Sequence, residues 1–300
     1  LNISFFKNKV EKQIIKHISF KIETNEIVAV VGESGSGKSI SSLALMGLLP
    51  KHISKITSGA ITFEDTNLVG ISEKEFQAIR GKDIAMIFQE PMSSLNPSMR
   101  CGKQVEEILK QHTNLSTSEI KLEVISLFEK VKLPHPERIY KSYPHEISGG
   151  QKQRVMIAMA IACKPKLLIA DEPTTALDVT VQKEILELLK TIQTETKMSV
   201  LFISHDLSLV SELADRVLVM YQGEIVEQGS TNKIFNAPKH NYTKALIAAR
   251  PSTEFRLKQL PTISDFMADT VNKDIISKAE RIKNHEKLYA QQPLLEILNV

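Results

Sequence analysis

An eight-residue loop constrains the fold more than any other feature of the sequence. Residues 32–39 read Gly-Glu-Ser-Gly-Ser-Gly-Lys-Ser and match the pattern GxxxxGK[ST] at every fixed position. A buried-strand pattern, Ile27–Val31, comes directly before the loop, and an apolar helical pattern, Ile40–Leu49, comes directly after it. This order predicts a phosphate-binding loop, because the backbone then turns successive N–H groups toward an anion at a helix N-terminus.

The residues of this loop have distinct expected tasks. Lys38 is expected to neutralise the β- and γ-phosphates of a nucleotide, and Ser39 to offer its hydroxyl to Mg²⁺. The alternative is a Gly/Ser loop that matches by accident, and the strand before it and the helix after it argue against accident. The other loop residues expected to contact phosphate are Gly32, Ser34, Gly35, Ser36 and Gly37.

The fold class follows from short apolar runs that alternate with longer amphipathic stretches. Each run is four or five residues long and bounded by polar or turn residues, as expected of strands covered on both faces. The pattern is typical of an α/β protein with a largely parallel sheet. The five runs are Ile27–Val31, Ile84–Phe88, Leu167–Ala170, Val200–Ser204 and Val217–Tyr221.

Two other patterns add a second layer and an insert. Apolar and polar residues alternate over Ile18–Ile22 and Ile61–Phe63, which predicts half-exposed strands of an antiparallel layer. Beyond Pro91 the strand patterns stop until the parallel sheet resumes after residue 154. Val105–Gln111 and Ser118–Lys130 instead have helical spacing, the latter with Ser118 as its predicted N-cap. We therefore predict a sheet domain interrupted by a helical insert.

Paired carboxylates follow one of the buried runs. Asp171 and Glu172 come directly after Leu167–Ala170, at the carboxyl edge of the predicted parallel sheet, where ligands bind in such folds. We expect Asp171 to orient Mg²⁺ through its water shell and Glu172 to act as general base on an attacking water. Alone, such a pair is usually a solvated turn; the phosphate loop is what gives it meaning.

Three further features share this predicted edge or resemble the phosphate loop. Gln89 and His205 each follow a buried run, and each taken singly is an ordinary structural or exposed residue. The segment Ser148-Gly149-Gly150-Gln151 opens an apolar helical stretch, so a second set of backbone N–H groups lies at a helix N-terminus. Because Lys38 already serves this chain's own phosphates, the expected ligand of that segment is the γ-phosphate held by a second protomer.

Composition excludes several classes of protein. With 42% hydrophobic and 24% charged residues and a net charge of +3, the chain is an ordinary globular one without the excess charge of a polyanion-binding surface. Its two cysteines, Cys101 and Cys163, form no CxxC pair, which favours a reducing compartment over a disulfide framework or zinc site. The longest apolar run, Val155–Cys163, is too short to span a bilayer, so any membrane-spanning part would be supplied by other chains.

Together and in this order, these elements resemble the ATP-binding domain of ABC transporters, over nearly all of residues 1–250. The resemblance identifies Walker A as Gly32–Ser39, Walker B as Leu167–Glu172 and the signature as Ile147–Gln151, in which Ile147 replaces the usual leucine. It further implies a Q-loop glutamine, a D-loop, a switch histidine and an adenine-stacking aromatic residue. These are Gln89, Ala176–Asp178, His205 and either Phe5 or its neighbour Phe6, with Phe5 at the expected position.

Two segments narrow the resemblance. Phe88–Pro97 looks like the Q-loop of the oligopeptide, dipeptide and nickel importers, and Ala237–Thr243 is similar to that group's C-terminal motif, with Asn241 where proline is usual. No cysteine follows Cys163, which excludes the iron–sulfur cluster that many single-domain members carry. With a strand start at Leu294–Val300, where Leu298–Val300 repeats the sense of Leu1–Ile3, this absence leads us to expect the first half of a fused double-ATPase subunit, as in glutathione and microcin C-type importers.

The resemblance implies an ATPase that powers import of peptides or peptide-like solutes. ATP and Mg²⁺ are the implied cofactors, with Ser39, Gln89 and Asp171 toward the metal and Lys38, Gln89, Glu172 and His205 catalytic. Two domains would close head-to-tail, the partner contributing Ser148, Gly150 and Gln151 across the interface. Gly149 and Asp178 complete the implied set of nucleotide-binding residues. The implied partners are permease subunits and, indirectly, a solute-binding protein, and no nucleic acid is expected. The implied location is the cytoplasmic face of the inner membrane, as a peripheral protein. The expected domains are 1–250 (core 1–89 and 155–250, helical insert 90–154), a linker 251–292 and a first strand 293–300.

Two alternatives belong to other functional classes. A soluble ABC ATPase acting on DNA or ribosomes would need a long coiled coil or zinc insertion, but only about a hundred residues separate the loop from the signature, without heptads or cysteine pairs. A regulatory nucleotide-binding module with weak hydrolysis is the second alternative. The presence of Lys38, Glu172 and His205 argues against it.

Overall fold

Two units make up the part of the chain that the structure describes. In this computed structural model they are Leu1–Ala237 and Pro238–Val300, and every residue predicted for the site belongs to the first. Ala176 of the predicted D-loop and Glu90–Ser93 of the predicted Q-loop segment lie outside the described residues. The described residues are 1–8, 10–89, 94–175, 177–249, 256–259, 262–268, 270 and 274–296.

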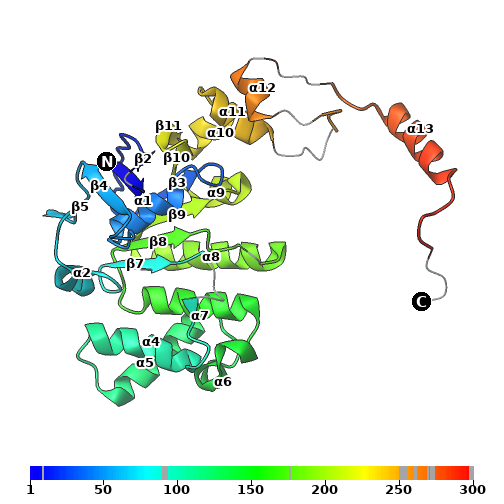
Figure 1. Cartoon of the computed structure of the whole chain (residues 1–300). Helices are drawn as coiled ribbons and strands as arrows, with labels where there is room; N and C mark the ends of the chain where they lie inside the picture. Colours follow the sequence, from blue (N-terminus) through cyan, green and yellow to red (C-terminus); the bar gives the residue numbers. More distant parts are fainter. Residues whose placement is uncertain are drawn as a thin grey trace. The chain divides into compact units, whose positions relative to one another are not determined.

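A six-stranded sheet forms the centre of the first unit (Figure 1). Its order is β11-β10-β3-β9-β8-β7, with the five predicted strands parallel and β11 antiparallel at the edge. Every residue of β3, β8 and β9 is buried, as their unbroken apolar patterns predict. The α/β prediction is therefore confirmed. The strands are β3 (Ile27–Val31), β7 (Ile84–Ile87), β8 (Leu167–Asp171), β9 (Ser199–Ser204), β10 (Arg216–Tyr221) and β11 (Glu224–Ser230).

A smaller antiparallel layer is present but is built from other strands than predicted. It consists of β1 (Asn2–Lys7), β2 (Val10–Ile15) and β4 (Ser54–Ser58) in the order β2-β1-β4. The prediction of a strand at Ile18–Ile22 is wrong, because its backbone forms no ladder although its apolar side chains do point inward. The prediction at Ile61–Phe63 holds only for the two-residue strand β5 (Thr62–Phe63), which pairs with β6 (Thr66–Asn67).

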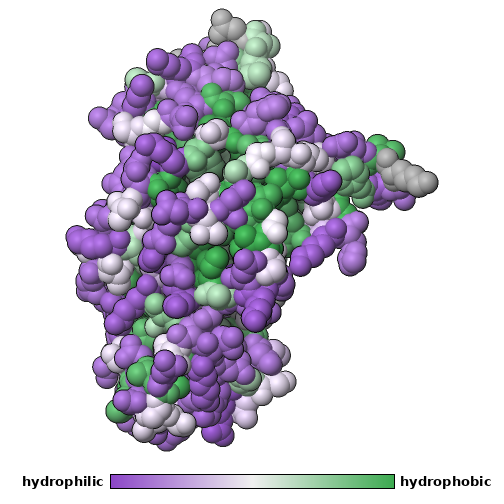
Figure 2. Space-filling view, turned by 90° about the vertical axis from the view of Figure 1, so that its left-hand side faces the viewer, coloured by the Kyte–Doolittle hydropathy of each residue, from purple (hydrophilic) through white to green (hydrophobic). Residues whose placement is uncertain are grey.

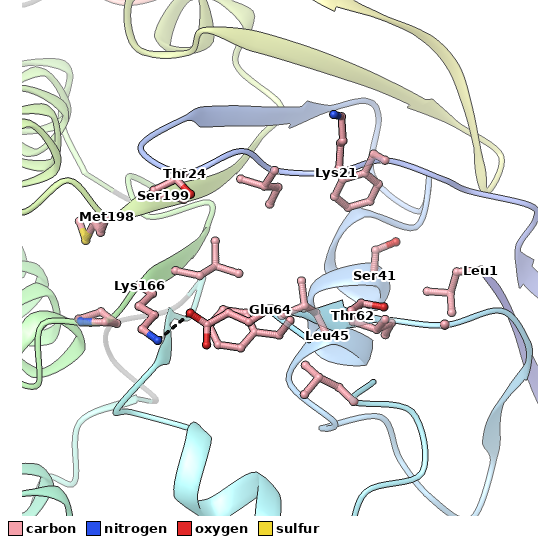
Figure 3. Close-up of a pocket in the computed structure, with 18 of the residues that line it drawn as sticks. Leu1, Lys21, Thr24, Ser41, Leu45, Thr62, Glu64, Lys166, Met198 and Ser199 are labelled. Atoms are coloured by element: carbon pink, nitrogen blue, oxygen red, sulfur yellow. Dashed lines mark hydrogen bonds and ion pairs between the residues drawn. The ribbon is translucent and has the colours of Figure 1, made fainter. Parts of the chain in front are cut away.

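A cavity of about 820 Å³ separates these two segments (Figure 3). It is also lined by Leu167 and Ser199, the first residues of β8 and β9, and an ion pair between Lys166 and Glu64, 2.7 Å long, lies at its wall. Figure 2 shows the face that lies on the left in Figure 1, and apolar side chains lie across the middle of this face with hydrophilic ones around them. The cavity lies at the amino ends of β8 and β9, whereas the phosphate loop follows the carboxyl end of β3. The cavity and the loop are therefore at opposite ends of the parallel strands.

Helices of the first unit lie between or after the core strands along the chain. The short helices α1 (Lys38–Leu45), α2 (Glu73–Ile79), α9 (Leu207–Leu213) and α10 (Thr231–Asn236) follow strands or turns of the core. The longest, α8 (Val179–Thr196), buries a stripe of six residues spaced three and four apart, five of them apolar and one a glutamine. Its members are Ile185, Leu186, Leu188, Leu189, Ile192 and Gln193.

The helical insert lies together on one side of the sheet (Figure 1). Its helix α5 begins two residues earlier than predicted, because Ser116 and not Ser118 is the N-cap and accepts a hydrogen bond from the Glu119 N–H. The last helix, α7, packs on α4, α5 and β7 and so belongs to both the insert and the core. The insert consists of α4 (Cys101–His112), α5 (Thr117–Lys130), α6 (Pro136–Lys141), a 3₁₀ turn (Pro144–Glu146) and α7 (Gly149–Ile161).

The second unit contains three helices within its described residues. They are α11 (Asn241–Ala248), α12 (Ile263–Met267) and α13 (Lys278–Tyr289). Residues 294–296 form no strand and 297–300 lie outside the described residues, so the predicted strand at 293–300 stays a prediction. Among the helices described here, none is long and apolar enough to cross a membrane.

Candidate functional site

The phosphate loop takes a backbone conformation that two of its glycines make possible. Gly32 has φ = 154°, and a Cβ there would lie 2.2 Å from the Met220 carbonyl oxygen. Gly37, the N-cap of α1, has φ = 107°, and a Cβ there would lie 2.5 Å from Ile15 Cδ1. Side chains at these positions would be strained and would collide. The loop therefore passes tightly over β2 and β10 before α1 begins.

The Lys38 ammonium lies inside this loop. Its Nζ donates to the carbonyls of Gly32 and Glu33, at 2.8 and 2.9 Å. Burial lowers the pKa of Lys38, and the carboxylates of Glu172, Asp171 and Glu33 act in the opposite direction. Because the hydrogen bonds described for this buried ammonium go to neutral carbonyls, an anion that enters the loop can replace them.

Ser36 supplies a second indication that the loop suits an anion. Within the described part of the molecule its Oγ is buried and makes no hydrogen bond. Buried polar atoms are nearly always satisfied, so an orphaned hydroxyl in a loop of this type indicates a ligand oxygen. The loop thus suits a phosphate group in two ways: it holds a positively charged ammonium, and it offers a buried hydroxyl that can donate a hydrogen bond.

Asp171 and Ser39 meet beside the loop. Ser39 Oγ donates to Asp171 Oδ1 at 3.1 Å, and Asp171, the last residue of β8, is buried. Burial raises the pKa of Asp171, the hydrogen bond from Ser39 lowers it, and the nearby Glu172 carboxylate raises it again. The pair presents a hydroxyl and a carboxylate, both hard oxygen ligands.

One carboxylate oxygen of Glu172 contacts three side chains, which follow the strands β7, β8 and β9. Its Oε2 accepts from Gln89 Nε2 at 3.0 Å and from Thr175 Oγ1 at 3.1 Å, and His205 Nδ1 lies 3.0 Å away. The residue has φ = 46°, unusual for a side chain with a Cβ, and its N–H donates to the Ile203 carbonyl at 2.9 Å. The structure thus brings together the predicted Gln89, Glu172 and His205.

Thr175 is the member of this cluster that sequence reasoning missed. Its N–H also donates to the Glu172 carbonyl, at 3.1 Å, so a single turn joins the two residues. The signal was present in the sequence: a hydroxyl three positions after a carboxylate, with a proline between, is typical of a closed turn.

The signature segment forms the first turn of α7. Ser148 Oγ accepts from the Gln151 N–H at 3.3 Å, and the Ser148 N–H donates to Gln151 Oε1 at 2.9 Å, which is a complete capping box. Ser148 and Gly149 are exposed. A Cβ at Gly150 would lie 2.9 Å from Val181 Cγ1, so this turn packs directly on α8.

The remaining predicted residues lie at two places. Asp178 is the N-cap of α8, where its Oδ1 accepts from the Val181 N–H at 2.9 Å. Phe5 is half-buried against the apolar core, whereas Phe6, on the other face of β1, is 37% exposed. Neither aromatic residue is distinguished by a contact with the phosphate loop, so their assignment stays a prediction.

The chain matches two models of known families. Residues 15–175 match the ABC transporter family, which is more than half of the chain, and residues 226–274 match the oligopeptide/dipeptide transporter C-terminal region. The second match includes the motif at Ala237–Thr243 that sequence analysis singled out.

Several curated proteins are similar over most of the chain. The oligopeptide transport ATP-binding protein OppD of Bacillus subtilis is 51% identical over 85% of this chain and 71% of its own length. The dipeptide transport ATP-binding protein DppD of the same organism is 46% identical, over 88% and 78%. The glutathione import ATP-binding protein GsiA of Escherichia coli K12 is 47% identical over 84% of this chain, which spans only 41% of that relative.

Solved structures share the fold. A dimeric ATP-binding cassette in a post-hydrolysis state, bound to ADP and Pi, is 26% identical with a TM-score of 0.67, over 76% of this chain and 98% of its own. The cbiO1 protein of Clostridium perfringens, part of an ABC transporter complex, is 27% identical with a TM-score of 0.65, over 78% and 90%.

Proposed function

The chain belongs to the ABC transporter family of ATP-binding proteins, and on that premise we propose that it hydrolyses ATP to power import of peptides or peptide-like solutes. One observation carries the catalytic part: Lys38, the Ser39–Asp171 pair and the cluster on Glu172 Oε2 all follow the carboxyl ends of adjacent strands. The relatives that import oligopeptides and dipeptides, with the matched C-terminal region, support the peptide part.

The nucleotide would be held by the phosphate loop. Lys38 would exchange its two carbonyl partners for β- and γ-phosphate oxygens, and Ser36 would donate its unpartnered hydroxyl. The backbone of Gly32, Ser34, Gly35 and Gly37 would line the anion, and Phe5 or Phe6 would stack on the adenine. ATP binding would thus depend on the hydrogen-bond donors of the phosphate loop and on one aromatic residue.

Mg²⁺ fits the oxygen atoms beside the loop. Ser39 Oγ and Asp171 lie together, and the Gln89 amide lies near Glu172, so hard oxygen donors are available without soft ligands. Across the described residues no group of three or more histidine, cysteine or carboxylate side chains offers a competing site. When bound, the metal supplies charge neutralisation on the phosphate oxygens.

Hydrolysis would use Glu172 as the base. A water in line with the γ-phosphate gives its proton to the Glu172 carboxylate while its oxygen attacks phosphorus, and ADP leaves. Since Oε2 is already occupied by Gln89, Thr175 and His205, the second oxygen or a released Oε2 must accept the proton. His205, with a side chain 62% exposed, is free to move toward the phosphate side of the site.

A second ATPase domain would complete the site. The exposed Ser148 and Gly149, with Gly150, Gln151 and Asp178, would contact a nucleotide held by that domain. We further propose that the domain is part of the same full-length chain, in line with the 41% of GsiA that this chain spans. Permease subunits, an indirectly acting solute-binding protein and a peripheral position on the cytoplasmic face of the inner membrane complete the proposal.

Glu172→Gln tests the catalytic part. With permease subunits in lipid vesicles, the variant is expected to bind ATP within about twofold of wild type and to lose turnover by about 100-fold or more. Glu187→Gln, an exposed glutamate of α8, is the matched control and should retain both. Turnover that survives Glu172→Gln would contradict the base assignment, and turnover without peptide uptake by the wild type would contradict the import assignment.

A further inference from the structure

Arg154 joins three helices at the centre of the unit. It lies buried on α7, three residues after Gln151, the last residue of the signature. Its Nη1 donates to the Val131 carbonyl, the C-cap of α5, at 2.8 Å. Its Nη2 donates to Glu184 Oε2 on α8, also at 2.8 Å. One guanidinium therefore connects the C-terminus of α5, within the helical insert, with a helix of the core.

These two contacts need the shape of arginine. The guanidinium is planar and presents donors in fixed directions, whereas a lysine ammonium is a single point charge on a flexible stem. Val131 is fully buried, and its carbonyl is one of the acceptors that a helix C-terminus leaves without an intrahelical partner. Without Arg154, the Val131 carbonyl would lose its hydrogen-bond donor and Glu184 of α8 would lose its ion pair with α7.

The bridge lies where the two partner-facing segments meet. The first turn of α7 packs on α8 at Gly150 and Val181, and Arg154 and Glu184 lie one turn further along each helix. The same α8 begins at its cap Asp178. The signature and Asp178 are thus attached to one another by a close backbone approach and by a charged bridge.

We infer that Arg154 is a positioning residue that holds Ser148–Gln151 and Asp178 in one rigid arrangement, so that both reach the second domain's nucleotide together. This inference rests on the proposed function, in which those residues act on the nucleotide of the partner domain. Arg154 itself touches neither nucleotide, and its contribution is to the geometry of the closed pair of domains.

A second ion pair provides a matched control. Lys130 of α5 lies 3.1 Å from Glu195 of α8, so it connects the same two helices as Arg154 does. It does so at the opposite end of α8, with side chains 35% and 55% exposed. Exposed pairs contribute little, and Glu195 lies 11 positions after Glu184, toward the end of α8 away from its cap Asp178. Lys130→Met therefore removes a bridge of the same kind without disturbing the partner-facing segments.

The experiment compares Arg154→Met with Lys130→Met in the importer assembled with its permease subunits and second ATPase domain. Arg154→Met is expected to lower kcat at saturating ATP by about tenfold, while ATP affinity measured on the uncomplexed chain stays within about twofold. Lys130→Met should leave both within about twofold. Arg154→Lys, which can keep one contact at a time, should recover part of the turnover.

Glu184→Gln keeps the inference testable where Arg154→Met folds poorly, since the Glu184 side chain is 53% exposed and the Val131 bond remains. It should lower kcat by about threefold, and combined with Arg154→Met it should add nothing further, because both remove one bridge. Unchanged kcat in Arg154→Met and Glu184→Gln, or an equal loss in Lys130→Met, would overturn the inference. A wild-type assembly without ATP turnover would instead contradict the proposed function.

Discussion

Ser39 Oγ donates a hydrogen bond to Asp171 Oδ1 over 3.1 Å, although 132 positions separate the two residues. The contact exists because β3 and β8 both neighbour β9, so the residues that follow or end these parallel strands reach the same edge of the sheet. Glu172 extends that edge toward β7 and β9 through Gln89 and His205. The candidate site is thus a property of strand order.

Lys38→Met should abolish ATP binding while leaving the chain folded. The change removes a buried charge whose pKa is lowered by desolvation, so little stability is lost with it. ATP affinity measured calorimetrically should fall by about 100-fold, with the melting temperature nearly constant. Lys166→Met, which removes an ion pair at the other edge of the sheet, is the control and should bind ATP normally. Normal ATP affinity in Lys38→Met would contradict the phosphate-loop assignment.

Gly37→Ala should destabilise the protein and weaken nucleotide binding together. At φ = 107° the new Cβ would lie 2.5 Å from Ile15 Cδ1, so strain adds to collision, and we expect a loss of about 2 kcal/mol or more. Gly70→Ala separates these terms, because Gly70 has φ = 90° with nothing within 4 Å of its Cβ position. Urea unfolding should show a smaller loss for Gly70→Ala, and equal losses would mean that the contact with Ile15 is unimportant.

Thr175→Val should lower turnover without changing ATP affinity. Valine keeps the shape of threonine but cannot donate to Glu172 Oε2, so the carboxylate loses one of the groups that orient it. We expect kcat to fall several-fold and Kd for ATP to stay within about twofold, with Thr175→Ser close to wild type. The assignment fails if the serine variant is as slow as the valine variant.

Asp171→Asn should stabilise the nucleotide-free protein at neutral pH. Burial raises the pKa of Asp171 above its unfolded value, so ionising it in the folded state costs free energy at pH values above that folded pKa. The variant should be more stable than wild type at pH 7, and the gain should disappear as pH falls below the unfolded pKa, where the aspartic acid is neutral in both states. Turnover should be lost, because the carboxylate beside Ser39 is gone.

Glu26→Gln serves as the opposite case. The hydrogen bond from Arg216 holds the pKa of Glu26 below its usual value, so this carboxylate stabilises the fold above its unfolded pKa and ceases to do so as pH falls through the folded pKa. Denaturation at pH 7 should therefore show Glu26→Gln less stable than wild type, and the difference should shrink in acid. A pH dependence of the same sign for both variants would contradict the assigned causes.

Much of the fold was predictable because its signals are local. The loop at Gly32–Ser39, the five buried runs and the helices of the insert depend on residue type and spacing over a few positions. One error, at Ile18–Ile22, arose where non-local contacts decide; the other, at the cap of α5, was a local one. Ile18–Ile22 has the alternation of a strand, yet a strand also requires a neighbouring backbone to pair with, and a cavity lies on that side. Ser116 replaced Ser118 as N-cap because Glu119 completes its capping box.

By itself, the sequence determined the phosphate loop, the α/β class and the residue types of the candidate site, since each is written in short-range patterns. Only the tertiary structure decided that Thr175 joins Gln89 and His205 on a single carboxylate oxygen, that Ser36 Oγ has no hydrogen-bond partner among the described residues, and that Arg154 connects α5 with α8. These relationships depend on which strands and helices become neighbours, and that choice is made by burial of the whole core rather than by any one segment.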